Sequence, residues 1–237
     1  MNNLQFIEKL LDIEKNYKTL YVMGCFGAPL SIQNKARYKN NHSYNKQIER
    51  QKMIDNATED TFGFDCVNLI KSIIWGWEGD KNKNYGGAIY NSNNLDDISA
   101  DMLITKCIDI STDFNNVKVG ELMWMKNHVG IYIGNAQVVE CSPAWKNGVQ
   151  ITRVLNIKSP TMQNASRIWT KHGKLPFINY LNIDNILKSE GQVAKEVLQG
   201  KWGNGADRKE KLIKAGYDYI NIQKEVNKIL KGDDKNV

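Results

Sequence analysis

The chain has 237 residues, of which 41% are hydrophobic and 24% are charged, and its formal net charge is +6 at pH 7. This length fits one medium domain and one small domain, and the composition is typical of a soluble globular protein. Lysine and arginine are scattered without a dense basic block, which argues against a nucleic-acid-binding arm and favours a partner of diffuse negative charge, such as a Gram-positive cell wall.

The N-terminal segment and the apolar runs show no membrane signal. Residues 1–8 lack the basic start, apolar core and cleavage site of a signal peptide. No apolar run is long enough to cross a bilayer. The sequence therefore predicts a protein that is made in the cytoplasm, does not insert into a membrane, and needs a separate agent to release it if it acts outside.

The first half of the chain reads mainly as helices and loops. Residues 4–16 have the apolar spacing of an amphipathic helix, residues 20–30 read as an ordered loop with a brief strand, and residues 31–60 as a polar surface excursion with one helix near 46–54. A buried helix is expected to begin at Cys66, after a glycine-containing loop, with Asp65 as its N-cap. Residues 78–96 read as a loop.

The second half changes character. Short alternating segments at 119–125, 128–133, 137–141, 148–153 and 167–170, separated by Gly and Asn turns, predict an antiparallel sheet. Helices followed by strands give the α+β class, with the Cys66 helix packed on the sheet. We expect residues 1–180 to form one domain, residues 181–190 a linker, and residues 191–231 a small three-helix bundle.

Cys66 is the cysteine whose position favours a nucleophilic thiol. Cys66 opens a helix, and a helix N-terminus and a nearby imidazole both lower the pKa of a thiol. His128 is the best candidate for the imidazole, and a third polar group must then hold its tautomer. Glu140 follows His128 by twelve residues across a predicted three-residue turn at 134–136. An odd-length loop puts both side chains on one face of the hairpin as diagonal neighbours, whereas a two-residue loop would separate them.

The other cysteines and histidines have more ordinary interpretations. A cysteine is more often a small buried hydrophobe, and a lone histidine is more often structural. No Cys-x-x-Cys pair or linear zinc motif exists, so we expect no disulfide framework, metal or cofactor. We assign the ordinary interpretations to Cys25, Cys107, Cys141, His42 and His172, with Cys141 pointing into the core on the face opposite Glu140.

Segments along residues 1–180 resemble the NlpC-type family of papain-like cell-wall peptidases. They are residues 21–24, 64–70, 120–125, 128–134 and 138–140. The resemblance implies a papain-like fold in which Cys66 is the nucleophile, His128 the general base and Glu140 the third polar residue. It also implies that Tyr21 lies near the oxyanion and that Asp65, just before the nucleophile, is part of the substrate site. Members of this family hydrolyse amide bonds in peptidoglycan stem peptides, typically between D-glutamate and the diamino acid, and sometimes the muramoyl–L-alanine bond.

Residues 200–208, 215–219 and 226–227 resemble the small cell-wall-binding repeat of some phage lysozymes. This resemblance implies binding to the muramyl-peptide part of peptidoglycan. Trp202, Arg208 and Tyr217 could offer stacking and hydrogen-bond contacts to sugar and peptide. The alternative is that Trp202 and Tyr217 form the core of this small unit. Such repeats often occur in tandem, so a single one would need self-association to gain avidity.

Together these features predict a phage endolysin with a cysteine amidohydrolase and a wall anchor. It would remain in the host cytoplasm until released and then act on peptidoglycan. Four alternatives stay open: muramoyl–L-alanine amidase specificity, acyl transfer to an amine, wall binding without catalysis, and a zinc amidase.

Overall fold

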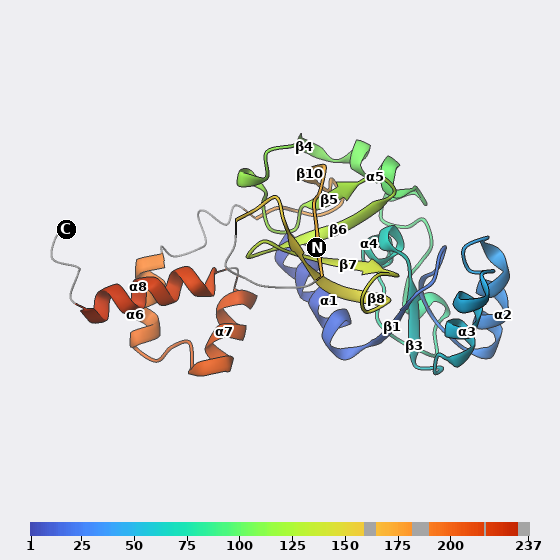
Figure 1. Ribbon diagram of the computed structural model, residues 1–237, viewed down its shortest axis with the longest axis horizontal. Coiled ribbons are helices and arrows are strands. Elements are labelled where there is room, and N and C mark those ends of the chain that lie inside the picture. The colour runs from blue at the N-terminus through green and yellow to red at the C-terminus, as the bar shows by residue number, and fades with distance from the viewer. Residues whose placement is uncertain (159–164, 182–189, 216, 232–237) are drawn as a thin grey trace. The chain divides into compact units, whose positions relative to one another are not determined.

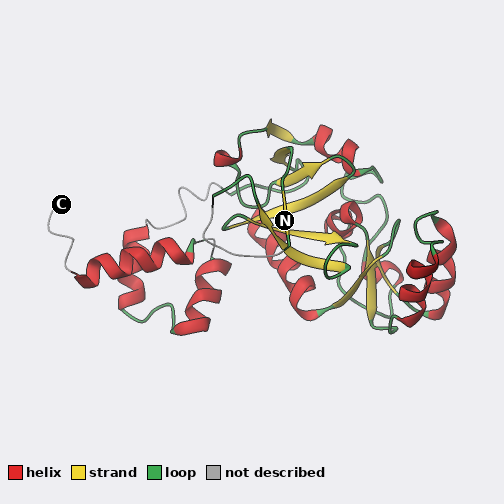
Figure 2. Cartoon of the chain, viewed as in Figure 1, coloured by secondary structure: helices red, strands yellow, loops and turns green. Residues whose placement is uncertain are grey.

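The computed structural model describes residues 1–158, 165–181, 190–215 and 217–231 (Figure 1). The chain divides into two compact units, residues 1–179 and 180–237. The first unit combines helices with two sheets (Figure 2), which confirms the mixed α+β class. Most of the predicted linker, residues 182–189, lies outside the described residues.

The helices of the first unit are amphipathic or fully buried. They are α1 (Asn3–Asn16), α2 (Ile32–Asn41), α3 (Ile48–Asn56), α4 (Cys66–Ile74) and α5 (Ala100–Lys106), with short 3-10 turns η1 (Asn84–Gly87) and η2 (Phe114–Asn116). Helix α1 begins with a capping box, in which the side chains of Asn2 and Gln5 each accept the backbone N–H of the other residue. The polar excursion of residues 31–60 holds two helices rather than the single one expected.

A small sheet leads into α4. Its strand order is β1-β3-β2, with β1 (Lys18–Tyr21) parallel to β3 (Thr61–Phe64) and β2 (Phe26–Pro29) antiparallel to β3. The expected glycine-containing loop before Cys66 is therefore a strand, and Gly63 pairs with Leu20. A Cβ built on Gly63 would lie 2.8 Å from the Cys25 sulfur, so close packing explains this glycine.

The larger sheet has the order β4-β10-β5-β6-β7-β8-β9. Its strands are β4 (Ile108–Ser111), β5 (Leu122–Met125), β6 (His128–Gly134), β7 (Gln137–Ser142), β8 (Gly148–Val154), β9 (Ser166–Arg167) and β10 (Lys171–Lys174). Neighbours pair antiparallel except β8 and β9, which are parallel. The four strands expected between residues 119 and 153 are present, whereas the fifth is replaced by two short strands, β9 and β10, on either side of residues 168–170.

The core of the first unit lies on both faces of this sheet. Helix α4 contacts β6 and β7, and it also contacts α1 and α5, so these helices cover one face. All nine residues of α4 are buried, which fixes the helix that starts at Cys66. The other face carries a cluster of buried residues that comprises Phe114, Met123, Tyr132, Ala136, Val138, Val154 and Trp169.

The second unit contains α6 (Glu190–Leu198), α7 (Gly205–Lys214) and α8 (Tyr219–Lys231). Its buried core consists of Val193, Ala194, Val197, Leu212, Tyr217, Ile222 and Val226. Leu230, near the end of α8, is exposed. Among the described residues of both units, none of the helices has the length and apolar character needed to span a membrane.

Candidate functional site

The N-terminus of α4 is fixed by the residue just before it. Asp65 accepts the Asn68 backbone N–H at 2.8 Å with one carboxylate oxygen, and with the other it accepts the Gly24 N–H at 2.8 Å and the Asn68 amide at 2.7 Å. The Asp65 side chain is buried. The carboxylate therefore connects the loop after β1 to the helix that carries Cys66. Because the Asp65 carboxylate is buried and bound by these protein groups, it does not face solvent, where a substrate would meet it.

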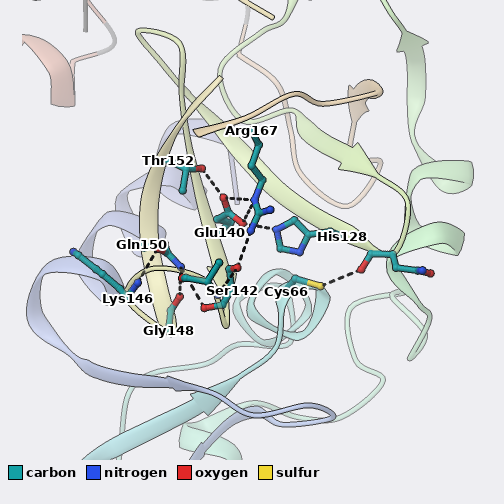
Figure 3. Close-up of polar contacts among 11 residues, drawn as sticks. Cys66, His128, Glu140, Ser142, Lys146, Gly148, Gln150, Thr152 and Arg167 are labelled. Atoms are coloured by element: carbon teal, nitrogen blue, oxygen red, sulfur yellow. Dashed lines mark hydrogen bonds and ion pairs between the residues drawn. The ribbon is translucent and has the colours of Figure 1, made fainter. Parts of the chain in front are cut away.

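The Cys66 thiol lies against the turn that connects β5 and β6. Its sulfur is 3.9 Å from the Asn127 carbonyl oxygen and interacts with the Val129 backbone N–H. These two residues flank His128 in the chain, so the thiol meets the segment that carries the imidazole. Figure 3 shows Cys66 and His128 on facing elements, with one ring nitrogen of His128 on the side towards Cys66.

The imidazole of His128 is held from two directions. Its Nε2 contacts Glu140 Oε2, and its ring stacks on buried Trp169, with ring centroids 5.6 Å apart and an interplanar angle of 16°. When Nε2 carries the proton that is donated to Glu140, Nδ1 is the basic nitrogen. This tautomer directs the lone pair of His128 away from Glu140, to the side of the ring where Figure 3 shows Cys66.

The β6–β7 hairpin brings His128 and Glu140 together with a different turn from the one expected. The turn between β6 and β7 has two residues, Asn135 and Ala136, both with positive φ, rather than three. Such a turn alone would separate His128 from Glu140. A bulge restores the parity, because the pairing shifts between Tyr132 and Gly134. His128 and Glu140 are therefore diagonal neighbours on one face. Cys141 lies on the other face, where its sulfur contacts the Phe64 carbonyl oxygen at 3.3 Å.

Glu140 is the centre of a buried polar network (Figure 3). Its side chain is 0% exposed, and it accepts the Thr152 hydroxyl at 2.6 Å and the Arg167 Nε–H at 2.8 and 2.9 Å. Burial raises the pKa of Glu140, but the hydrogen bonds and charges of His128 and Arg167 outweigh burial and hold it below its usual value. Glu140 is therefore a carboxylate at neutral pH and can stabilise an imidazolium on His128.

Sequence reasoning missed Thr152, Arg167 and Trp169 as neighbours of the site. Thr152 had a detectable signal, because strand parity puts it on the same face as Glu140 once β7 and β8 are paired. Arg167 and Trp169 had none, since the parallel placement of β9 beside β8 could not be inferred from the sequence.

The protonation state of Cys66 differs from the expectation. Burial raises the pKa of the Cys66 thiol to about 12, and the nearby charges of Asp65 and Glu140 raise it further, against the backbone N–H groups of Val129 and Val67, which lower it. The prediction that the helix N-terminus leaves a low thiol pKa is therefore wrong, because desolvation is the larger effect. The thiol keeps its proton until a base removes it.

Tyr21 ends β1 and pairs with Phe64, two residues before Cys66. Its side chain is 5% exposed. Burial, and then the charges of Cys66 and Asp65, raise the pKa of its hydroxyl, so it stays protonated and can donate a hydrogen bond. Tyr21 is thus a neighbour of the thiol, and its place near the oxyanion stays a prediction.

The residues given ordinary interpretations are buried or engaged elsewhere. His172 contacts Glu121 through Nδ1 at 2.5 Å and the Asp113 carbonyl oxygen through Nε2 at 3.0 Å. All four cysteines are free and buried. Across the described ranges, no three His, Cys, Asp or Glu side chains gather in the manner of a metal site.

Two of the three site candidates of the second unit contribute to its core. Tyr217 is buried, and Trp202 is partly buried against it in an edge-to-face contact with ring centroids 5.5 Å apart. The Trp202 indole N–H donates to Glu196 at 3.2 Å. Arg208 binds the Gly203 carbonyl oxygen and the Asn204 side chain, each at 3.0 Å. Trp202 and Tyr217 therefore both contribute to the core of this unit, as the alternative interpretation expected.

Comparison with known proteins concerns mainly this second unit. Residues 191–230 match the family model of the CW_7 repeat. A segment of 49 residues is 52% identical to the lysozyme of Streptococcus phage Cp-7, and it covers 21% of this chain and 14% of that protein. No solved structure matches the chain. The expected phage-lysozyme-type repeat is therefore present at residues 191–230.

Proposed function

We propose that this chain is a phage peptidoglycan hydrolase whose first unit is a papain-like cysteine amidohydrolase. The observation that carries the proposal is the contact of His128 with buried Glu140, beside a segment that touches the Cys66 thiol. A nucleophile, a base and a group that orients the base are the parts that thiol hydrolysis of an amide requires. Cys66 at the start of α4, packed against β6 and β7, supports the NlpC-type resemblance.

The reaction begins with proton transfer from the thiol. Because the pKa of Cys66 is raised to about 12, His128 Nδ1 removes this proton as the sulfur attacks a stem-peptide carbonyl. The imidazolium is stabilised by Glu140, which accepts its Nε2–H. The backbone N–H of Cys66 and the Tyr21 hydroxyl donate to the oxyanion.

The imidazolium of His128 then protonates the leaving amine, and a thioester on Cys66 remains. Water attacks this thioester while His128 takes its proton, and collapse of the second tetrahedral intermediate frees the new carboxyl group and the thiol. Each proton returns to its starting position, so the cycle needs no further reactant. In an acyl transfer, an amine would replace the water and the product would join two substrates.

The second unit would hold the enzyme on its substrate. A CW_7 repeat occupies residues 191–230, and the relative that shares 49 residues with the chain is named a lysozyme and comes from a phage. We infer that this unit binds the cell wall of a bacterium. A binding unit raises the local concentration of substrate at the catalytic unit without adding a contact to the reaction itself.

The name of the relative favours one competing function, cleavage of a glycosidic bond. That chemistry uses two carboxyl groups about 5 to 10 Å apart with access to the sugar. At this site Glu140 and Asp65 are both buried and bound by other protein groups. Neither carboxylate is free to reach a sugar, so we favour amide hydrolysis. Mass spectrometry of digested peptidoglycan separates the outcomes, because amide hydrolysis leaves the glycan chains intact.

The decisive variant is Cys66→Ala, tested on purified Gram-positive walls by loss of turbidity. Its matched control is Cys107→Ala, since Cys107 is another buried free thiol but lies at the end of α5. We expect Cys66→Ala to lower the rate by at least about a thousandfold and the control to stay within a few-fold of the unmodified protein. Clearing that continues unchanged in Cys66→Ala would refute the thiol mechanism.

A further inference from the structure

The turn between β7 and β8, residues 143–147, presents an exposed tryptophan beside the Glu140 network. Trp145 is 50% exposed, and its backbone has a φ of +56°. This left-handed conformation is uncommon for a large side chain and costs backbone energy. Because half of the indole stays in solvent, burial repays only part of that cost.

Hydrogen bonds from the buried side chain of Gln150 hold the turn in this conformation. Gln150 is 1% exposed and donates from Nε2 to the carbonyl oxygens of Ala144 at 2.9 Å and Ser142 at 3.2 Å, while its Oε1 accepts the Lys146 N–H at 3.2 Å. On the far side of the turn, Arg50 donates to Asn147 at 2.6 Å. Figure 3 shows the Gln150 side chain between Ser142 and Lys146. The Trp145 backbone is therefore preorganised.

A single arginine connects Trp145 to the base. The guanidinium carbon of Arg167 lies 4.7 Å from the centroid of the Trp145 ring, and the same guanidinium donates to Glu140 through Nε and to Ser142 Oγ at 2.7 Å. One face of the indole thus rests on Arg167, and the exposed half of the side chain is left to a ligand. Glu140 in turn contacts His128, so the indole is two side chains from the imidazole.

We propose that Trp145 contacts the substrate and binds a sugar ring of the glycan close to the amide that is cleaved. This inference rests on the proposed function, because it takes peptidoglycan as the substrate. A fixed, flat and half-exposed indole matches the apolar C–H face of a pyranose, and it brings little conformational entropy to the contact. The catalytic unit would then prefer a stem peptide that still carries its sugar.

The test compares two soluble substrates with the full-length protein. One is a disaccharide muropeptide, and the other is the same stem peptide without sugar. Trp145→Leu keeps an apolar side chain but removes the flat ring, whereas Trp145→Phe keeps a ring. On the muropeptide we expect Trp145→Leu to raise KM about tenfold with kcat within about twofold, and Trp145→Phe to restore most of the affinity. On the sugar-free peptide, neither variant should change KM.

Two further variants exclude trivial explanations. Trp145→Asn suits the positive φ, so it should unfold at the same or a higher temperature than the unmodified protein while it shows the same rise in KM. Leu155→Asn replaces an exposed apolar side chain just after β8, and it should leave both substrates unaffected. An effect confined to Trp145 and to the sugar-containing substrate supports the inference.

An unchanged KM on the muropeptide would overturn the inference, and so would an equal rise on both substrates, which would place the indole on the peptide. Failure of the proposed function looks different. In that case Cys66→Ala would remain active, whatever the Trp145 variants do. Loss of activity in Cys66→Ala together with normal kinetics in Trp145→Leu would refute the sugar contact alone.

Discussion

Replacement of Arg167 by methionine probes the buried network that holds the base. Glu140 is 0% exposed and Arg167 is 19% exposed, so the variant leaves a carboxylate in the interior without its guanidinium partner. Breaking a buried pair in this way costs about 3–5 kcal/mol. Thr152 and His128 still bind the carboxylate, so we expect the low end, about 3 kcal/mol. For a protein of this size, that loss lowers the melting temperature by about 6–12 °C.

The assay is urea unfolding at pH 7 of the unmodified protein, Arg167→Met, Glu140→Gln and the double variant. Once the charge of Glu140 is gone, loss of Arg167 should cost much less, so the double variant should be at least about 1.5 kcal/mol more stable than additivity predicts. Lys39→Met is the control, because its ion pair with Asp55 is at the surface and is worth at most about 1 kcal/mol.

The same variant has a pH signature. The pKa of Glu140 is held below its ordinary value of 4.5 in the folded state, so this group contributes stability above that pH, and the contribution is lost as the pH falls through its folded pKa. Arg167→Met should shrink this contribution. Two results would refute the assigned role of Arg167. One is that the stability losses of Arg167→Met and Glu140→Gln simply add in the double variant, and the other is that Arg167→Met loses no more stability than Lys39→Met.

Three other predictions follow from the geometry. Burial raises the pKa of the Cys25 thiol from 9.0 to about 12, so the stability that this group contributes is complete below pH 9 and is lost as the pH rises towards 12. Cys25→Ala should therefore make the free energy of unfolding fall less steeply between these pH values, by about 1.4 kcal/mol per pH unit. An unchanged slope would contradict this prediction. Ala136→Gly should stabilise the protein by about 0.5–1 kcal/mol in urea unfolding, because Asn-Gly suits a two-residue turn with positive φ; destabilisation would show that the buried methyl group matters more. Trp202→Ala should weaken sedimentation with cell walls and leave cleavage of soluble muropeptides unchanged, whereas unaltered sedimentation would make Trp202 peripheral to recognition.

The parts of the site that follow from local periodicity could be predicted. Strand alternation places His128 and Glu140 on one face, and the helix that starts at Cys66 follows from its apolar spacing and from Asp65 as N-cap. The diagonal contact was expected for the wrong local reason, since the sequence does not show that a two-residue turn would be offset by a bulge. The catalytic roles assigned to these residues stay predictions.

The parts that depend on distant pairing or on burial could not be predicted. Arg167 reaches Glu140 because β9 lies parallel to β8, and no local pattern encodes that neighbour. The thiol pKa of Cys66 depends on how deeply the side chain is buried, whereas the sequence shows only that it opens a helix. Helix α2 was missed because it is polar, with Tyr38 as its one buried residue. Tertiary contacts stabilise such a helix more than its own propensity does.

The bulge between Tyr132 and Gly134 has a consequence for how this hairpin can vary in length. The residue left unpaired by this bulge is Ile133, because Tyr132 pairs with Val138 and Gly134 pairs with Gln137. Deleting Ile133 would remove the bulge but leave the pairing of Tyr132 with Val138, so His128 and Glu140 would stay on one face. Inserting one residue between His128 and Tyr132 would instead turn the imidazole to the opposite face, away from Glu140. The hairpin can therefore shorten by one residue at the bulge without loss of the contact, but it cannot lengthen by one residue next to His128.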